Sequence, residues 1–244
     1  MLMNIILLIL AAGVPYYLVL EKNKKLNSEK IFLISAFLLL CAIVVSTFVE
    51  SQYSALLVSV ALLSAMFSIY KATKTTNFYK FGYYLLFINA PFFMLFIREQ
   101  GVLYSLSLLI TLAGVYSIAK HYDKYYGSAN YHAISGTTLA TPYVGAFLTV
   151  YLITLALYPP FPNALFLLSN MIKEEATLLW YIVVVVVFFG NFIIAMRVMP
   201  RTVFGTPNTN LHYVDLTSKE KVMHFVIIIA LLSLSFIGFK GAIA

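Results

Sequence analysis

Apolar runs long enough to cross a bilayer recur along the whole chain, with short polar segments between them. A membrane-spanning helix needs about 20 mainly apolar residues, because each residue advances the helix by about 1.5 Å. We predict eight such helices, at residues 2–20, 31–49, 53–70, 79–97, 101–119, 137–158, 177–197 and 222–240. The pattern predicts an all-α, polytopic membrane protein of about eight transmembrane helices, with residues 1–244 in a single transmembrane domain.

The sixth predicted helix is interrupted at its end. Pro159, Pro160 and Pro162 follow its last turn, and a further apolar stretch runs over residues 164–172. Proline removes a backbone donor and clashes with the preceding turn. We therefore expect either one helix broken at Pro159–Pro162 or a helix followed by a re-entrant half-helix. Backbone left unpaired at that depth must be buried in protein or must line a wet cavity.

Basic residues alternate between the two sides of the predicted membrane domain. Thirteen of the 16 lysines and arginines follow the first, third, fifth and seventh predicted helices, and only Arg98, Lys173 and Lys240 lie on the opposite side. Lysine and arginine concentrate in cytoplasmic loops. Both termini should therefore lie outside, and the alternation supports the count of eight helices. The net charge of +7 then reports orientation in the membrane, and no nucleic-acid partner is expected.

Composition excludes an ordinary soluble domain. The chain is 62% hydrophobic and 10% charged, whereas soluble domains are about 45–50% apolar and about 25% charged. The polytopic pattern and the basic loops predict location in the inner (cytoplasmic) membrane of a bacterium or archaeon. Cys41 is the single cysteine, so it cannot form a disulfide within the chain.

Motifs for enzyme chemistry are absent from the sequence. It contains no phosphate-binding loop, no C-x-x-C and no H-E-x-x-H. We predict no catalytic residue, no cofactor and no metal site, and no catalytic activity of the chain by itself. The four histidines, His121, His132, His212 and His224, are expected to be solvated residues of loops or of the membrane interface.

Candidates for an ion path are few, because the acidic residues all fall at predicted helix ends or in loops. Charged groups inside a bilayer are costly and usually functional. Glu50, between the second and third predicted helices, is the best intramembrane acid, although a solvated turn explains it as well. Asn89 lies beside Pro91, where a kink is expected. Together with Thr141 and Asn191 it fits either a wet path or a packing contact between helices.

The segment before the last helix carries a helix-start signal. Asp215 and Thr217 are both suitable N-caps, and Glu220 follows Thr217 by three residues, as in a capping box. We therefore expect the last helix to begin at this point.

Residues 141–240 resemble the C-terminal part of the antiporter-like membrane subunits. These are the proton-channel subunits of respiratory complex I, of membrane-bound hydrogenases and of Mrp-type antiporters. The features that carry the resemblance follow in order along the chain: Thr141-Pro142, the break from Leu155 to Pro162, Trp180, Arg197, Arg201, Gly205, Asp215-Leu216, Glu220 and the closing Gly238-Phe239. The family has about fourteen helices, so this chain looks like a shortened or split relative.

The resemblance implies a membrane subunit of an ion-coupled, chiefly proton-coupled, multi-subunit complex, such as a proton-translocating oxidoreductase. It implies a structural role or part of a shared ion path, since Leu167 stands where conducting members carry lysine or glutamate. The partners implied are a larger antiporter-like subunit, a cytoplasmic catalytic protein or both. One variant is an inorganic-carbon uptake complex with a zinc-containing partner. The alternative is a small secondary transporter for a neutral or weakly polar solute, with a site near Asn89, Asn191 and the break.

Overall fold

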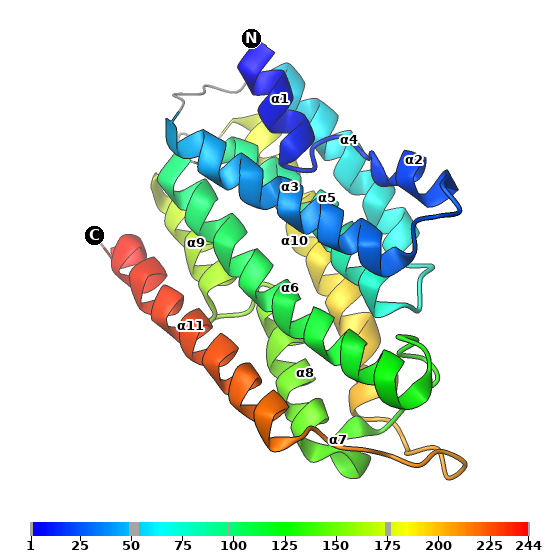
Figure 1. Ribbon diagram of the computed structural model, residues 1–244. Coiled ribbons are helices and arrows are strands. Elements are labelled where there is room, and N and C mark those ends of the chain that lie inside the picture. The colour runs from blue at the N-terminus through cyan, green and yellow to red at the C-terminus, as the bar shows by residue number, and fades with distance from the viewer. Residues whose placement is uncertain (1, 49–53, 97, 174–176, 244) are drawn as a thin grey trace.

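The computed structural model describes residues 2–48, 54–96, 98–173 and 177–243, which fold into one helical bundle without strands (Figure 1). The helices are α1 (Leu2–Leu10), α2 (Tyr17–Lys22), α3 (Ser28–Phe48), α4 (Ala55–Ala72), α5 (Phe78–Leu95), α6 (Arg98–Tyr126), α7 (Thr137–Ala140), α8 (Pro142–Leu155), α9 (Pro162–Lys173), α10 (Leu178–Val198) and α11 (Ser218–Ile243), with a π-helical turn η1 (Met199–Val203) after α10.

Five of these helices, α3, α4, α6, α10 extended by η1, and α11, are long and apolar enough to cross a membrane. The described chain is therefore an integral membrane protein by helix length and composition. The predicted count of eight spans and the predicted side of the termini stay predictions.

Helix α5 lies at the centre of the bundle. Sixteen of its 18 residues are buried, and it packs against α3, α4, α6 and α10. The helix continues through Pro91, so the expected disturbance beside Asn89 does not end it. A helix surrounded by other helices needs no apolar lipid-facing surface, and α5 accordingly carries tyrosines, an asparagine and a glycine within its length.

The prediction of one helix over residues 2–20 is wrong, because the chain leaves the helix after α1 and resumes it at α2. Ala12 adopts a left-handed backbone, with φ of 61°. The Gly13 N–H then donates to the Leu8 carbonyl at 2.8 Å, which is the long hydrogen bond of a Schellman helix end. Pro15 follows and has no N–H with which to continue the helix.

The predicted break at Pro159–Pro162 is confirmed, since α8 ends at Leu155 and α9 begins at Pro162. The backbone at this break has the same conformation as at the break between α1 and α2. Leu157 has a φ of 60°, and the Tyr158 N–H donates to the Ile153 carbonyl at 3.3 Å. Proline is well suited to the first turn of a helix, where its missing N–H has no partner anyway. The two broken helices thus share one geometry.

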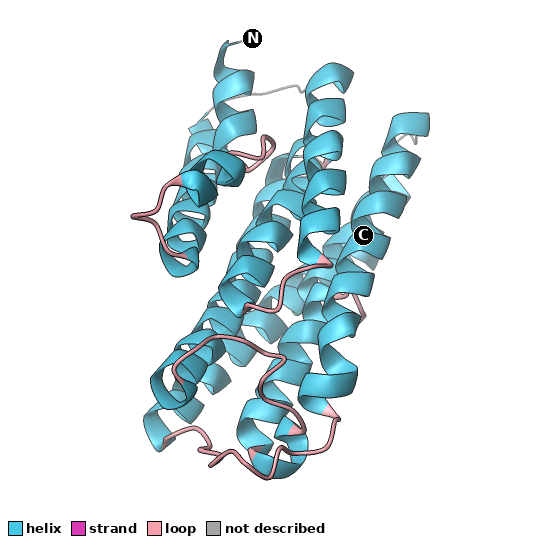
Figure 2. Ribbon diagram, turned by 90° about the vertical axis from the view of Figure 1, so that its right-hand side faces the viewer, coloured by secondary structure: helices cyan, strands magenta, loops and turns pink. Residues whose placement is uncertain are grey.

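Loops that carry or adjoin lysines and arginines gather on one side of the bundle, toward the lower right of Figure 1, and the two ends of the chain lie on the other side. Figure 2 shows that the described elements are helices joined by loops. We name the first side the basic end and define it by residues 23–27, 73–77, 127–136 and 204–217. Arg197 ties this end together, because its guanidinium donates to the Thr75 carbonyl and, at 3.0 Å, to the Tyr131 hydroxyl.

Both predicted caps before α11 are used, but on different helices. The Thr217 N–H donates to Glu220 Oε2 at 2.8 Å, and the Glu220 N–H approaches Thr217 Oγ1 at 3.4 Å, so the predicted capping box is confirmed. Asp215 instead caps α8, where its carboxylate accepts from the N–H groups of Tyr143 and Val144, each at 3.2 Å. The chain before α11 thereby holds the start of α8.

Candidate functional site

A stripe of small and polar residues runs the length of α6. It consists of Gln100, Tyr104, Ser107, Thr111, Gly114 and His121. Residues at intervals of three, four and seven share one face of a helix, and α6 packs against α8, α9 and α11. From Gln100 to His121 the stripe spans about 32 Å at 1.5 Å per residue. A hydrocarbon core is about 30 Å thick, so the α6 stripe reaches across it.

His121 is the residue of the stripe nearest the basic end, and Glu220 of α11 lies beside it. His121 Nε2 lies 2.9 Å from the Val214 carbonyl, and a carbonyl can only accept, so this nitrogen carries the proton of the neutral ring. His121 Nδ1 then presents its lone pair toward Glu220 Oε1, 3.7 Å away, and it has no other hydrogen-bond partner. The ring nitrogen and the carboxylate oxygen therefore face each other across a gap that no hydrogen bond closes.

His224 lies deeper, on α11, and is completely buried. Its Nδ1 is 2.7 Å from the Tyr151 hydroxyl, and its Nε2 is 3.4 Å from Ser117 Oγ. The ring of Phe147 stacks on it, with 4.9 Å between centroids. An imidazole with a hydroxyl at each nitrogen can receive a proton on one side and release one on the other.

A polar cavity of about 460 Å³ opens beside these two histidines. It is lined by Ser117, Lys120, His121, Asp123, Lys124 and Glu220. Because Ser117 lines the cavity and also contacts His224, the cavity connects the basic end with the buried histidine.

The prediction that all four histidines are solvated is wrong for His121 and His224, whose exposed fractions are 2% and 0%. The physical reason is helix length. Helix α6 continues to Tyr126, well beyond its apolar run, and α11 begins at Ser218. Both histidines therefore lie within helices and against neighbouring helices. His212, in contrast, is exposed as predicted.

The other half of the α6 stripe contacts α9, the half-helix that follows the break. Ser107 Oγ donates to Asn163 Oδ1 at 2.5 Å, and Gln100 Nε2 donates to Ser169 Oγ at 3.2 Å. Asn163 Nδ2, Asn170 Oδ1 and Gln100 Oε1 have no hydrogen-bond partner. A buried polar atom left unpaired costs about 1–3 kcal/mol, so this side of α9 is suited to water or to a passing proton.

Gly114 separates the two halves. A Cβ atom at this position would lie 2.3 Å from Tyr151 Cζ, so only glycine lets the tyrosine ring approach α6 this closely. Among the described residues, no hydrogen bond joins Tyr151 to Ser107 or Asn163. The site is therefore two polar half-paths that meet at the ring of Tyr151.

The predicted ion-path residues fall in three places. Asn89 and Asn191 meet in the core, where each Nδ2 donates to the Oδ1 of the other at 2.9 Å, and Tyr104 donates to Asn89 Oδ1. Thr141 lies between α7 and α8, where its hydroxyl donates to a backbone carbonyl at 3.2 Å, and it takes no part in this pair. Glu50 lies outside the described residues.

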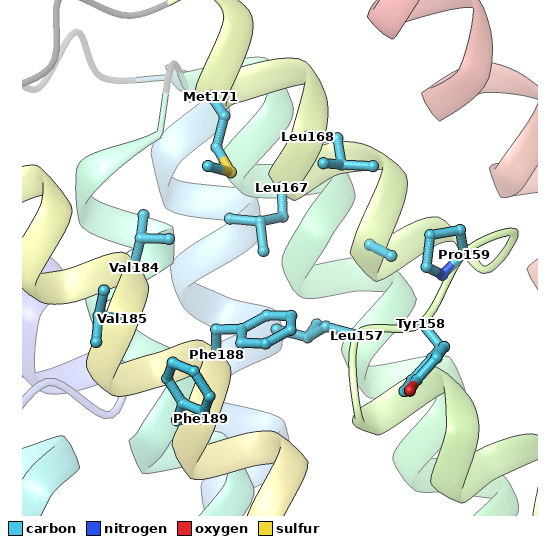
Figure 3. Close-up of a pocket in the computed structure, with 11 residues that line it drawn as sticks. Leu157, Tyr158, Pro159, Leu167, Leu168, Met171, Val184, Val185, Phe188 and Phe189 are labelled. Atoms are coloured by element: carbon cyan, nitrogen blue, oxygen red, sulfur yellow. The ribbon is translucent and has the colours of Figure 1, made fainter.

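An apolar crevice of about 350 Å³ lies between α9 and α10, beside the break (Figure 3). Leu167 and Met171 from α9, and Val184 and Phe188 from α10, line it. Leu167, where conducting members of the resembled family carry a charged residue, thus faces a hydrocarbon-like surface. The α6 stripe contacts α9 through different residues of that helix, Asn163 and Ser169.

Across the described residues, no three His, Cys, Asp or Glu side chains converge as they would around a metal ion. Comparison with known proteins finds no family model that matches the chain and no curated protein that matches its sequence. The chemistry of the site must therefore be argued from its own geometry.

Proposed function

We propose that the chain is a membrane subunit of a proton-coupled, multi-subunit assembly, and that protons cross it along the α6 stripe. The observation that carries the proposal is His224, a completely buried imidazole with a hydroxyl on each of its nitrogens. Ionisable residues inside a membrane are costly and usually mark ion paths. The resemblance of residues 141–240 to the proton-channel subunits supports the same conclusion.

Each step of the path as far as Tyr151 moves a proton between groups that the chain itself supplies. A proton from the basic end reaches the cavity that His121 and Glu220 line, where His121 Nδ1 lies 3.7 Å from Glu220 Oε1. From this cavity it passes by way of Ser117 to His224 Nε2, and the imidazole releases a proton from Nδ1 to the Tyr151 oxygen. Beyond Tyr151 the proton passes to water, which the unpaired amide atoms of Asn163 and Asn170 on α9 would hold by hydrogen bonds.

The proposed partners follow from the resemblance and from the charge of the basic end. A larger antiporter-like subunit would pack against the lipid-facing helices, and a cytoplasmic catalytic protein would dock on the basic loops. The solute-transporter alternative has less support, because Asn89 and Asn191 use all four amide hydrogens on each other and on the carbonyls of Leu85 and Val187. Neither side chain has a donor left for a solute.

Proton flux into proteoliposomes tests the path. The tagged chain is purified in mild detergent with whatever chains accompany it, reconstituted with a pH-sensitive dye inside, and driven by a potassium diffusion potential. His224→Phe should slow the flux about ten-fold or more, because a phenylalanine ring cannot take up and release a proton. A ten-fold slowing corresponds to a proton-transfer barrier that is higher by about 1.4 kcal/mol. His212→Phe is the matched control, since His212 is an exposed loop histidine.

Equal flux through the His224→Phe variant and the wild type would overturn the path. Mass spectrometry of the same preparation tests the assembly separately. Co-purification of other membrane subunits or of a catalytic protein is expected, and a homogeneous preparation of this chain alone would overturn the subunit proposal.

A further inference from the structure

A second polar cavity, of about 640 Å³, lies at the basic end between the end of α4 and the start of α5. Three lysines, Lys71, Lys74 and Lys80, line it together with Tyr70 and Tyr84. Its remaining lining is uncharged. The cavity is separate from the α6 stripe, whose own cavity is lined by different residues.

The three lysines have no carboxylate partner among the described residues, where Glu29 pairs with Lys120 and Glu220 faces His121. Lys74 Nζ instead donates to the Tyr70 hydroxyl at 2.8 Å. Glu21 is the carboxylate behind this cavity, but it accepts from the hydroxyls of Tyr83 and Tyr84, each at 2.7 Å. Three like charges held around one cavity repel one another unless an anion joins them.

The start of α5 does not supply the binding groups. Asn77 Oδ1 already accepts from the N–H groups of Tyr79 and Lys80, at 2.9 and 3.2 Å, and the Phe78 N–H donates to the Ala129 carbonyl at 3.0 Å. The charged donors available to an anion are therefore the lysine ammonium groups, beside the hydroxyl and amide groups of the rest of the lining.

An apolar strip on α4 leads from this cavity into the membrane. Leu63, Met66 and Phe67 are among the exposed large side chains of α4, and they precede Tyr70 by seven, four and three residues, on the same face of the helix. Lys71 Nζ lies 6.0 Å from the centroid of the Phe67 ring, so charge and apolar surface adjoin. A ligand that satisfies both has an anionic head and hydrocarbon tails.

We propose that this cavity binds the phosphate-bearing headgroup of an anionic phospholipid, whose acyl chains lie along Leu63, Met66 and Phe67. A lysine near the membrane surface contributes about 1 kcal/mol to anionic-lipid binding. Three lysines therefore give a preference for anionic over zwitterionic lipid on the order of 100-fold. Free phosphate shares the headgroup chemistry but gains nothing from the apolar strip.

Thermal unfolding in a non-ionic detergent tests the proposal, with the fluorescence of the single tryptophan, the buried Trp180, as the signal. Phosphatidylglycerol, phosphatidylcholine and inorganic phosphate are titrated separately. Phosphatidylglycerol should raise the melting temperature at a mole fraction about 100-fold below that needed with phosphatidylcholine. Inorganic phosphate should have no comparable effect.

The variant K71Q/K74Q/K80Q should lose the preference for phosphatidylglycerol. Its matched control, K22Q/K24Q/K25Q, removes the same charge from exposed lysines outside the cavity and should keep the preference. If the cavity variant does not fold, Lys80→Gln alone decides, with an expected loss of about five-fold.

Three outcomes would overturn the proposal. They are equal stabilisation by phosphatidylcholine, an unchanged preference in the cavity variants, and stabilisation by inorganic phosphate as strong as that by the lipid. The last outcome would assign the cavity to a free anion.

Discussion

Replacing Gly114 with alanine tests the central contact of the proposed path. The added Cβ would lie 2.3, 2.5 and 2.7 Å from three atoms of the Tyr151 ring. Carbon atoms pack best at about 3.5–4.0 Å, so the ring must move by about 1 Å or more. Tyr151 is completely buried, and the movement should break its 2.7 Å hydrogen bond to His224.

The expected cost of Gly114→Ala combines three contributions. Overpacking a buried site costs about 1–3 kcal/mol, and losing a buried hydrogen bond costs about 1 kcal/mol. Alanine returns about 1 kcal/mol, because it favours the helix more than glycine does. The free energy of unfolding should therefore fall by about 1–3 kcal/mol, and proton flux should fall with it.

Two assays separate packing from proton transfer. Unfolding by a denaturing detergent in mixed micelles gives the stability, and the proteoliposome assay gives the flux. Tyr151→Phe keeps the ring and removes the hydroxyl, so it should reduce flux with little change in packing. Tyr151→Leu removes the ring, so Gly114→Ala should cost nothing in that background.

The refuting result is a Gly114→Ala cost that is the same with tyrosine and with leucine at position 151. The close contact would then not be the cause of the loss. Undiminished flux in Tyr151→Phe would exclude the hydroxyl from the path, whatever the stability shows.

The remaining predictions concern contacts outside the stripe. Asn89→Leu and Asn191→Leu should each destabilise by about 1–3 kcal/mol, because the surviving asparagine loses the partner of its second amide hydrogen; additive costs in a double-mutant cycle would contradict the pairing. Asp215→Ala should lower the free energy of unfolding by about 1 kcal/mol. Amide hydrogen exchange at the start of α8 should become faster, and unchanged exchange would show that Asp215 does not cap α8. Burial and two nearby arginines hold the pKa of His132 below its ordinary 6.5. The unfolded chain therefore binds more protons below about pH 6.5, so stability should be level above that pH and fall below it. His132→Gln should lessen this slope, and an unchanged slope would assign it wholly to other groups.

Hydropathy predicted most of the helices because apolar length is a local property of the chain. It failed at residues 2–20, where the run of apolar side chains is continuous but the backbone turns at Ala12. Gly13 and Pro15 were the available signals, since both favour a helix end. The break before Pro162 was predictable because three prolines within four residues leave no room for a continuous helix.

The α6 stripe could be read in part from the sequence. Its residues recur at helical spacing, and Gln100, Ser107, Gly114 and His121 stand seven apart. Its partners could not be read, because the contact between Ser117 and His224 joins positions 107 residues apart. The same holds for Asn89 and Asn191, which were both chosen as polar residues within apolar helices without any sign that they meet.

The arrangement of helices follows from the solvent in which they lie. Lipid chains are as apolar as leucine, so an apolar side chain gains no free energy by moving from lipid into the bundle. A polar or charged side chain that faces lipid costs free energy. In the apolar part of α11, 22% of the residues are buried, against 56% in α6. Helix α5, which does not meet the hydropathy criterion for a span, is the most enclosed. Helices α5 and α6 are thus more enclosed than the other long helices, and this places the α6 stripe and the Asn89–Asn191 pair inside the bundle, where the proposed proton path is kept from lipid.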